Sequence, residues 1–353
     1  MRTNIVVDRS RGPGCREKGR RALRLGRVLL AVVGALACAP PGLCLEVTSY
    51  ARMCDASAAV AMGPKHFVVA DDERNVLRIY RRGQPQPVRS IPLSAFLDTE
   101  EEKESDLEGA AARGSRIFWI SSHGRNSQGK LQQRRYRFFA TRVERGSPPR
   151  LIPIGKPYTE LLSDLIAADE KWGYGLVEAS RLPPEAAGGL NIEGLAATPE
   201  GTLLIGFRNP IPGSRALIVP LQNPEQLIDG GRARFGTPIE LDLGCRGVRS
   251  IERIGPDYLV VAGPPADAGT FALYRWSGGA GEAARMLPSA DLEGLRPEAL
   301  FAVPHSGLVQ ILSDDGGVES EGIACKDRPE SAQSFRSILF EHGVGMPPDS
   351  PPR

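Results

Sequence analysis

The sequence predicts an all-β fold, a single β-propeller of five to six blades. Glycine and proline are abundant, with 40 Gly and 30 Pro among 353 residues, yet 41% of the residues are hydrophobic. This composition favours many short strands joined by many turns, and it argues against a helical bundle, a coiled coil or a multi-span membrane protein. A strand-turn-strand pattern also recurs along the chain, as expected for a repeat architecture.

The repeated pattern is an acidic residue, a short apolar strand, a turn, a second apolar strand and a polar loop. Its five copies begin at Asp55, Glu108, Glu193, Glu252 and Glu298. Several copies continue into a further apolar strand, as in NVLRIYRR after the first and RALIVPL after the third. Three or four strands per unit, repeated about every 45–60 residues, are typical of a β-propeller.

The repeats define one propeller domain over 54–340. We expect an N-terminal linker and closing strand at 38–53 before it, and a disordered tail at 341–353 after it. The interval between the second and third repeats is the longest, and within it the leucines of 158–169 have helical spacing. We therefore predict a helical insertion at 150–189.

The start of the chain predicts export. Clustered arginines precede the apolar run 28–37, which is too short to span a bilayer but suits a signal peptide over 1–37. We expect a periplasmic or secreted protein with no membrane span. Cys38 follows a small-residue cleavage pattern, so a lipid anchor at Cys38 is the alternative to simple cleavage.

Charge limits the partners. The first 45 residues hold nine basic and two acidic residues, and in the rest of the chain acidic residues outnumber basic ones, 40 to 35. A mildly acidic mature protein argues against nucleic acid as a partner. We expect a monomer that binds a small polar or anionic ligand.

Three of the six cysteines, Cys54, Cys245 and Cys325, lie well inside the predicted domain. An exported protein keeps disulfides, and a bond between Cys54 and Cys325 would tie the first folded segment to the last. The alternative is three buried free thiols.

The repeats also predict a site. An antiparallel hairpin returns its second strand to the end where the first began, so the leading acid and the closing loop of each repeat lie on one face of the ring. We expect the five leading carboxylates to converge around the central channel. The loop residues expected to join them are Asp71, Asp72, His123, Arg125, Arg208, Asn209, Asp314 and Asp315.

Such a group of carboxylates needs compensation, because each close pair costs roughly 2–3 kcal/mol at ~5–8 Å and an effective dielectric of ~20. A hard cation such as Ca²⁺ could supply it, as could guanidinium partners such as Arg125, Arg208 and Arg249. In the third alternative each glutamate binds main-chain amides of the adjacent blade. Two other charged segments are interpreted as solvated, the acidic loop 99–106 and an outer strand at 134–137.

Several motifs resemble a bacterial family known as domain of unknown function 3616. The motifs are CDASAAVAM at 54–62, VVADDERNVLRIY at 68–80, DLEGAA at 106–111, SHGRN at 122–126, NIEGLA at 191–196, GFRNP at 206–210, RSIERI at 249–254, RPEALF at 297–302 with its preceding Arg296, and CKD at 325–327. The resemblance covers nearly all of the chain after the leader. It implies an exported propeller related to other EGLA-bearing propellers, including the esterase-like domain associated with phytases, and it brings no established reaction.

Three functional hypotheses follow. In the first, a small polar or anionic ligand binds at an acidic, Ca²⁺-containing mouth formed by Asp55, Asp72, Arg125, Arg208, Asn209, Glu252, Arg296 and Glu298. The second is a metal-assisted hydrolase of phosphate esters or lactones, in which Glu193, Asn209 and Asp314 hold the metal and Glu108 or His123 acts as acid or base. In the third, the same face is a protein-interaction platform without metal.

Overall fold

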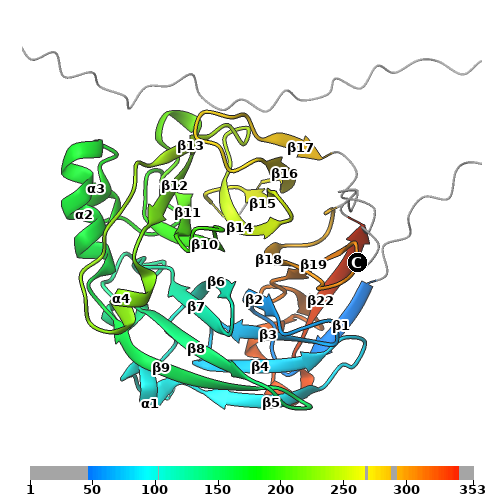
Figure 1. Cartoon of the computed structure of the whole chain (residues 1–353). Helices are drawn as coiled ribbons and strands as arrows, with labels where there is room; N and C mark the ends of the chain where they lie inside the picture. The colour runs from blue at the N-terminus through cyan, green and yellow to red at the C-terminus, as the bar shows by residue number, and fades with distance from the viewer. Residues whose placement is uncertain (1–46, 102, 267–268, 288–291, 342–353) are drawn as a thin grey trace, which may run out of the picture.

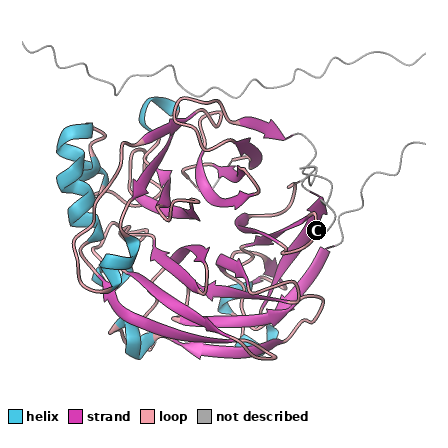
Figure 2. Cartoon of the chain, in the orientation of Figure 1, coloured by secondary structure: helices cyan, strands magenta, loops and turns pink. Residues whose placement is uncertain are grey.

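The computed structural model is a five-bladed β-propeller, and it describes residues 47–341 except 102, 267–268 and 288–291 (Figure 1). Each blade is a four-stranded antiparallel sheet, and the five sheets stand around a common axis. Strands dominate, and the few helices lie outside the ring (Figure 2). The predicted range of five to six blades therefore resolves to five.

Four blades are built from strands in chain order, with the innermost strand first. Blade 1 contains β2 (Ala56–Ala61), β3 (His66–Asp71), β4 (Val76–Arg81) and β5 (Pro87–Pro92). Blade 2 contains β6 (Leu107–Arg113), β7 (Arg116–Ser121), β8 (Phe138–Glu144) and β9 (Arg150–Tyr158). Blade 3 contains β10 (Asn191–Ala197), β11 (Leu203–Asn209), β12 (Ala216–Leu221) and β13 (Ile239–Leu241). Blade 4 contains β14 (Gly247–Ile254), β15 (Asp257–Gly263), β16 (Ala272–Trp276) and β17 (Arg285–Leu287).

The fifth blade combines the two ends of the described chain. Its strands are β18 (Pro297–Ala302), β19 (Leu308–Ser313), β22 (Ser334–Glu341) and, outermost, β1 (Val47–Ala51). β1 pairs antiparallel with β22, so the first strand of the domain completes the sheet of the last blade. This pairing closes the ring with a strand that precedes the repeats in the chain. The small hairpin of β20 (Glu319–Ser320) and β21 (Ile323–Ala324) lies between β19 and β22 in the chain.

A disulfide reinforces this closure. Cys54 and Cys325, the pair favoured from the sequence, are bonded with an S–S distance of 2.01 Å across 271 residues of chain. Both half-cystines are buried, with 1% and 5% exposure. The bond joins the start of blade 1 to the excursion between β19 and β22.

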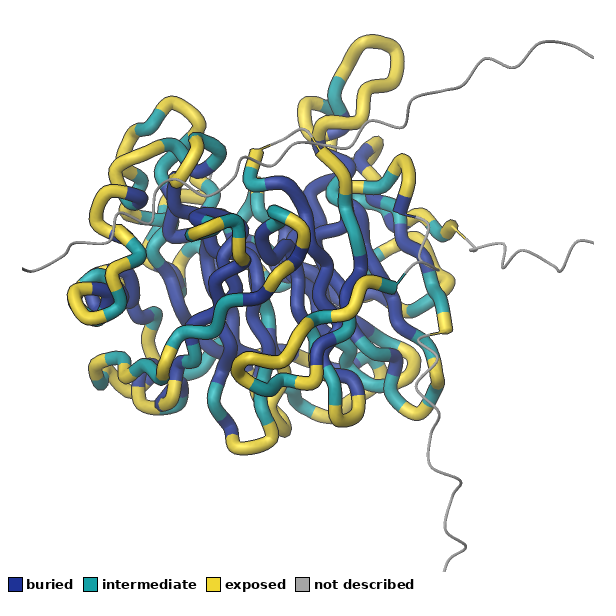
Figure 3. The backbone as a smooth tube through the Cα atoms, turned by 90° about the horizontal axis from the view of Figure 1, so that it is seen from above, coloured by how far each residue is buried: buried dark blue, intermediate teal, exposed yellow. Residues whose placement is uncertain are grey.

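The hydrophobic core is divided among the five interfaces between neighbouring blades. The interface between blades 5 and 1 is aromatic: Tyr50 lies against Phe67, Tyr80 and Phe335 with ring centroids 5.0–5.4 Å apart. Buried strands accordingly fill the centre of the molecule and exposed loops lie at its edges (Figure 3).

The helical insertion lies between blades 2 and 3, where it packs on the outside of the ring (Figure 1). It contains α2 (Leu161–Trp172) and α3 (Leu176–Ala179), so the helix begins three residues later than the predicted span 158–169. The predicted insertion boundary at 150 is wrong, because Arg150–Tyr158 pairs with β8 as the fourth strand of blade 2. The remaining helical turns are α1 (Ser94–Leu97), α4 (Pro224–Ile228), η1 (Gln133–Arg135), η2 (Pro212–Ser214), η3 (Cys325–Asp327) and η4 (Glu330–Ala332).

The predicted signal peptide at 1–37, Cys38 and the tail beyond Glu341 lie outside the described residues. Within the described part of the chain, no helix has the length and apolar character needed to cross a membrane.

Candidate cation and ligand site

Every innermost strand carries a β-bulge close to its first residue. The strand pairing skips one residue in each case, and the skipped residues are Ser57, Glu108, Glu193, Arg249 and Glu298. A bulged residue is unpaired in the ladder and its side chain is re-aimed. The five innermost strands are neighbours around the axis, so the bulges bring one side chain from each blade to the same end of the channel.

A small residue follows each bulge: Ala58, Gly109, Gly194, Ser250 and Ala299. Close packing between neighbouring inner strands explains why these residues are small. A Cβ at Gly109 would lie 2.7 Å from Ile120 Cγ2 and 3.1 Å from Leu195 Cβ of blade 3, and one at Gly194 would lie 2.6 Å from Val248 Cγ1 of blade 4. In blades 2 and 3 the Glu-Gly pair therefore combines a side chain aimed at the axis with close contact between blades.

Glu252 is not the axial residue of blade 4, which corrects the sequence prediction. Arg249 occupies the bulge, and Glu252 lies three residues further along β14, opposite Leu259. Its carboxylate instead accepts a backbone hydrogen bond from Ala302 in blade 5, and burial raises its pKa to about 7. Glu252 thus follows the main-chain alternative considered from the sequence.

Four of the five bulged residues form one continuous network. Ser57 Oγ donates to Glu298 Oε2 at 3.0 Å, and Glu298 Oε1 pairs with Arg249 Nη2. Arg249 Nε lies 3.0 Å from Glu193 Oε2, and Arg208 Nη1 lies 3.1 Å from Glu193 Oε1. Guanidinium partners therefore compensate the carboxylates of Glu193 and Glu298.

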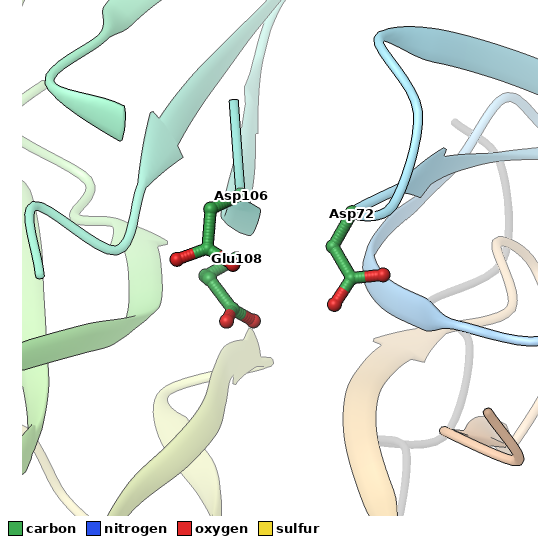
Figure 4. A group of neighbouring side chains, drawn as sticks. All are labelled: Asp72, Asp106 and Glu108. Atoms are coloured by element: carbon green, nitrogen blue, oxygen red, sulfur yellow. The ribbon is translucent and has the colours of Figure 1, made fainter. Parts of the chain in front are cut away.

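Glu108 is the exception. Its side chain is only 9% exposed, yet among the described residues it forms no hydrogen bond or ion pair. The carboxylates of Asp72 and Asp106 lie beside it, and one oxygen from each of the three falls within 4.8 Å of the others. Asp106 and Glu108 come from the start of blade 2, and Asp72 faces them from the turn between β3 and β4 of blade 1 (Figure 4). We call Asp72, Asp106 and Glu108 the carboxylate cluster.

Burial and mutual repulsion make this cluster electrostatically unfavourable when ionised. Burial, followed by the charges of Glu193 and Asp106, raises the pKa of Glu108 well above its ordinary range. Burial and the charge of Asp55 do the same to the pKa of Asp72, whose Oδ1 is buried without a hydrogen bond. Burial also raises the pKa of Asp106, although Arg135 opposes this from 2.9 Å. The cluster therefore favours either protons or a cation.

The cluster lines a cavity of about 410 Å³ at the axial mouth. Eight acidic and five basic side chains line it, so its net charge favours a cation. Four of the basic groups have acidic partners: Arg135 with Asp106 and Glu104, Arg208 and Arg249 with Glu193, and Lys326 with Glu73. Among the described residues, the exposed guanidinium of Arg296 has no such partner, and it lies over Gly317, where a Cβ would come within 2.6 Å of Nη1. Phe271, Pro264 and Ala266 add a short apolar wall.

The structure brings most of the predicted site residues to this cavity. Asp55, Asp72, Glu108, Arg208, Arg296, Glu298 and Asp314 all line it. Asp71 and Asp315 are instead buried in ion pairs with Arg78 and Arg336, each at 2.7 Å.

Glu193 and Glu252 do not line the cavity, and neither do His123, Arg125 and Asn209. His123 is 1% exposed, its Nδ1 lies 2.7 Å from the carbonyl oxygen of Ser121, and burial lowers its pKa to about 4. Arg125 Nε donates to the carbonyl oxygen of Ser180 at 2.8 Å. Asn209 Nδ2 donates to the carbonyl oxygens of Pro184 and Ala186 at 2.8 and 2.7 Å.

Arg125 and Asn209 thus secure the loop that follows α3 instead of binding a ligand. Of the predicted metal set of Glu193, Asn209 and Asp314, Asp314 lines the cavity, whereas Glu193 pairs with arginines and Asn209 contacts the loop after α3. The carboxylate of Glu193 forms ion pairs with Arg208 and Arg249. The Nδ2 group of Asn209 donates hydrogen bonds to carbonyl oxygens.

Sequence reasoning missed Asp106, Arg135 and Lys326. The segments 99–106 and 134–137 are not simply solvated, because Glu104 pairs with both Arg134 and Arg135, and Arg135 in η1 holds Asp106. A signal for Asp106 was present, since it stands two residues before Glu108 in DLEGAA, where NIEGLA has Asn191. Asn191 Nδ2 donates to Glu193 Oε1 at 2.9 Å.

The fold and this cavity define a class, that of five-bladed propellers with an acidic axial site. Residues 155–335, about half of the chain, match the model of the family described as Protein of unknown function (DUF3616), and the chain belongs to that family. No curated protein matches it in sequence.

Solved structures with similar chain paths are distant in sequence. One, described as an oxidoreductase (glucose dehydrogenase) from Thermus thermophilus, has 14% identity and a TM-score of 0.44 over 84% of this chain and 100% of its own. The PQQ-bound form of aldose sugar dehydrogenase from Streptomyces coelicolor has 10% identity and a TM-score of 0.38 over 86% and 100%. The β-propeller domain of Cps50 (Swd1) from Myceliophthora thermophila has 10% identity and a TM-score of 0.36 over 83% and 99%.

Proposed function

We propose that the axial cavity binds a divalent cation of the Ca²⁺ type at Asp72, Asp106 and Glu108, and with it a small polar or anionic ligand. The observation that carries the proposal is the state of Glu108. It occupies the same bulge position as Glu193 and Glu298, it is buried, and it alone of these three carboxylates forms no ion pair or hydrogen bond within the described chain, although the charges of Arg249 and Arg208 act on it from further away.

The chemistry of the cluster suits a hard cation. Ca²⁺ takes six to eight oxygen ligands, and carboxylates supply them with flexible geometry. Three carboxylates would leave further coordination positions for water or ligand oxygens. Binding would also offset the repulsion that raises the pKa values of Glu108 and Asp72.

The rest of the cavity supports a small anionic ligand. Its volume of about 410 Å³ is in the range of small-molecule sites. Arg296 offers a guanidinium without an acidic partner in the described structure, and guanidinium groups suit carboxylates and phosphates. Phe271 provides a small apolar surface for a carbon skeleton.

We also infer that the protein is exported and that it binds its ligand in the periplasm or outside the cell. The apolar run after the clustered arginines supports export. The disulfide between Cys54 and Cys325 is of the kind that persists in oxidising compartments.

Thermal unfolding and calorimetry test the cation site. Wild-type protein treated with EDTA should gain thermal stability when Ca²⁺ is added, because a ligand that binds only the folded state stabilises it. Glu108→Gln should lose this response. Glu170→Gln on the exposed face of α2 is the matched control and should respond as the wild type does. A wild-type protein that neither binds Ca²⁺ in calorimetry nor gains stability contradicts the proposal.

One observation favours hydrolysis as a second candidate function. Asp55 lines the same cavity, and burial together with the charge of Asp314 raises its pKa to about 9. A carboxyl group that keeps its proton at neutral pH could donate it to a leaving group. Chromogenic phosphate esters and lactones should then turn over with Ca²⁺ present, and Asp55→Asn should reduce kcat more than KM. Absence of turnover with a Ca²⁺-loaded wild type leaves a binding protein.

A further inference from the structure

The disulfide and the carboxylate cluster are linked through two short stretches of chain. Cys54 is followed directly by Asp55, and Cys325 is followed directly by Lys326. Both Asp55 and Lys326 line the cavity. The bond therefore fixes two parts of the cavity wall that are far apart in the sequence.

Lys326 extends this link to the cluster itself. Its Nζ lies 2.9 Å from Glu73 Oε1, and Glu73 follows Asp72 in the turn between β3 and β4. The side chains of this pair are 47% and 46% exposed, so the pair alone would contribute little. However, Lys326 directly follows Cys325, which the disulfide bond to Cys54 holds in place.

Main-chain hydrogen bonds complete the connection. Asp315 N donates to the carbonyl oxygen of Cys54 at 3.0 Å, and Lys326 N donates to the carbonyl oxygen of Gly316 at 3.1 Å. The segment that carries Lys326 is thus folded back onto the start of blade 1. The segment runs over 314–326 and so also includes Asp314, which lines the cavity.

We propose that Cys54 and Cys325 are positioning residues for the cation site. Their disulfide holds Lys326, and Lys326 holds the turn that presents Asp72 to Asp106 and Glu108. This inference rests on the proposed cation binding. Without the bond the turn would have to be ordered when the cation binds, and the loss of conformational entropy would lower the affinity.

The first experiment compares Ca²⁺ binding of the oxidised wild type with that of Cys54→Ser/Cys325→Ser by calorimetry, at a temperature where near-UV circular dichroism shows both to be folded. We expect about tenfold weaker binding in the variant. Affinities within twofold of each other, with both proteins folded, overturn the inference. A wild type that does not bind Ca²⁺ overturns the proposed function instead, so the two failures are distinguishable.

The second experiment keeps the disulfide and asks whether a substitution of Lys326 raises or lowers the Ca²⁺ affinity. Lys326→Met removes a positive charge near the cluster, so electrostatics alone predicts tighter Ca²⁺ binding, whereas a positioning role predicts weaker binding. Lys171→Met on α2 is the control and should leave affinity unchanged. Weaker binding of Lys326→Met supports the inference and tighter or unchanged binding overturns it. If the double cysteine variant does not fold, the result for Lys326→Met still tests whether Lys326 positions the turn that carries Asp72.

Discussion

Glu108 and Glu193 occupy the same bulge position on neighbouring inner strands, yet two arginines pair with Glu193 and none with Glu108. The two residues stand in similar motifs, DLEGAA and NIEGLA, which share the Glu-Gly pair and the final alanine. The motif therefore specifies where the carboxylate lies. Residues outside the motif determine whether the carboxylate forms an ion pair with arginine.

Neutralising the two kinds of carboxylate should have opposite effects on the cation-free protein. Glu108→Gln removes a buried carboxyl group whose ionisation is disfavoured, so the free energy of unfolding in EDTA should rise. Glu298→Gln weakens the pairing of Arg249 and should lower it. Urea unfolding of both variants measures the difference, and a shift in the same direction for both would contradict this account.

Arg249 should be the most sensitive residue of the axial network. Arg249 is 5% exposed, and its guanidinium pairs with both Glu193 and Glu298. Arg249→Met would leave Glu298 buried without a cationic partner and Glu193 with Arg208 alone, and breaking such a buried pair costs about 3–5 kcal/mol. Arg253→Met, at an exposed position on the same strand, is the control and should change stability by less than about 0.5 kcal/mol. If Arg249→Met and Arg253→Met lowered the free energy of unfolding in urea equally, the proposed stabilising role of the axial network would be refuted.

Stability in EDTA should fall as the pH rises from about 7 to 9. The pKa of Asp55 rises from 3.8 to about 9 on folding, so the folded state keeps a proton that the unfolded chain has already lost. The stabilisation from this proton is complete below the unfolded pKa of 3.8 and is lost progressively as the pH rises to the folded pKa of about 9, with a slope of up to about 1.4 kcal/mol per pH unit. His123 does not titrate in this window, since its pKa is about 4 when folded. Chemical denaturation at several pH values measures the slope.

Asp55→Asn should flatten this pH dependence. Ca²⁺ should flatten it as well, because the cation competes with protons for ionised carboxylates and so stabilises most at high pH. A slope unaffected by the substitution would place the titrating group elsewhere.

The glycines that follow Glu108 and Glu193, Gly109 and Gly194, should resist replacement by a larger residue. In Gly109→Ala the new methyl group would meet Ile120 and Leu195 at 2.7 and 3.1 Å, and we expect a loss of about 1–3 kcal/mol. Gly307→Ala is the matched control, because a Cβ there has no neighbour within 4 Å and the backbone angle is unremarkable for an L-residue. The midpoint of thermal unfolding should fall for Gly109→Ala and stay nearly constant for Gly307→Ala.

Much of the fold could be predicted from the sequence because the blades repeat one pattern. The acid, strand, turn and strand of each copy indicated the number of blades and the shared face on which loops converge. The outer strands were harder, since β9 alternates between buried and exposed positions weakly and precedes α2 without a clear break.

The site was predicted only in part, because three-dimensional register decides which side chain reaches the axis. In RSIERI the acidic residue suggested Glu252, whereas the bulge selects Arg249. His123 and Asn209 looked functional because polar residues in a loop motif often bind ligands, yet their partners are main-chain carbonyl oxygens. Nothing in the local sequence shows that Arg135, in a basic run, crosses to Asp106.

The pairing of β1 with β22 has a consequence for biosynthesis. The first strand has no partner until the last one has been made, so blade 5 stays incomplete while the ribosome adds the intervening four blades. A nascent chain stalled anywhere before Ser334 would expose the edge of an unfinished sheet to chaperones and proteases.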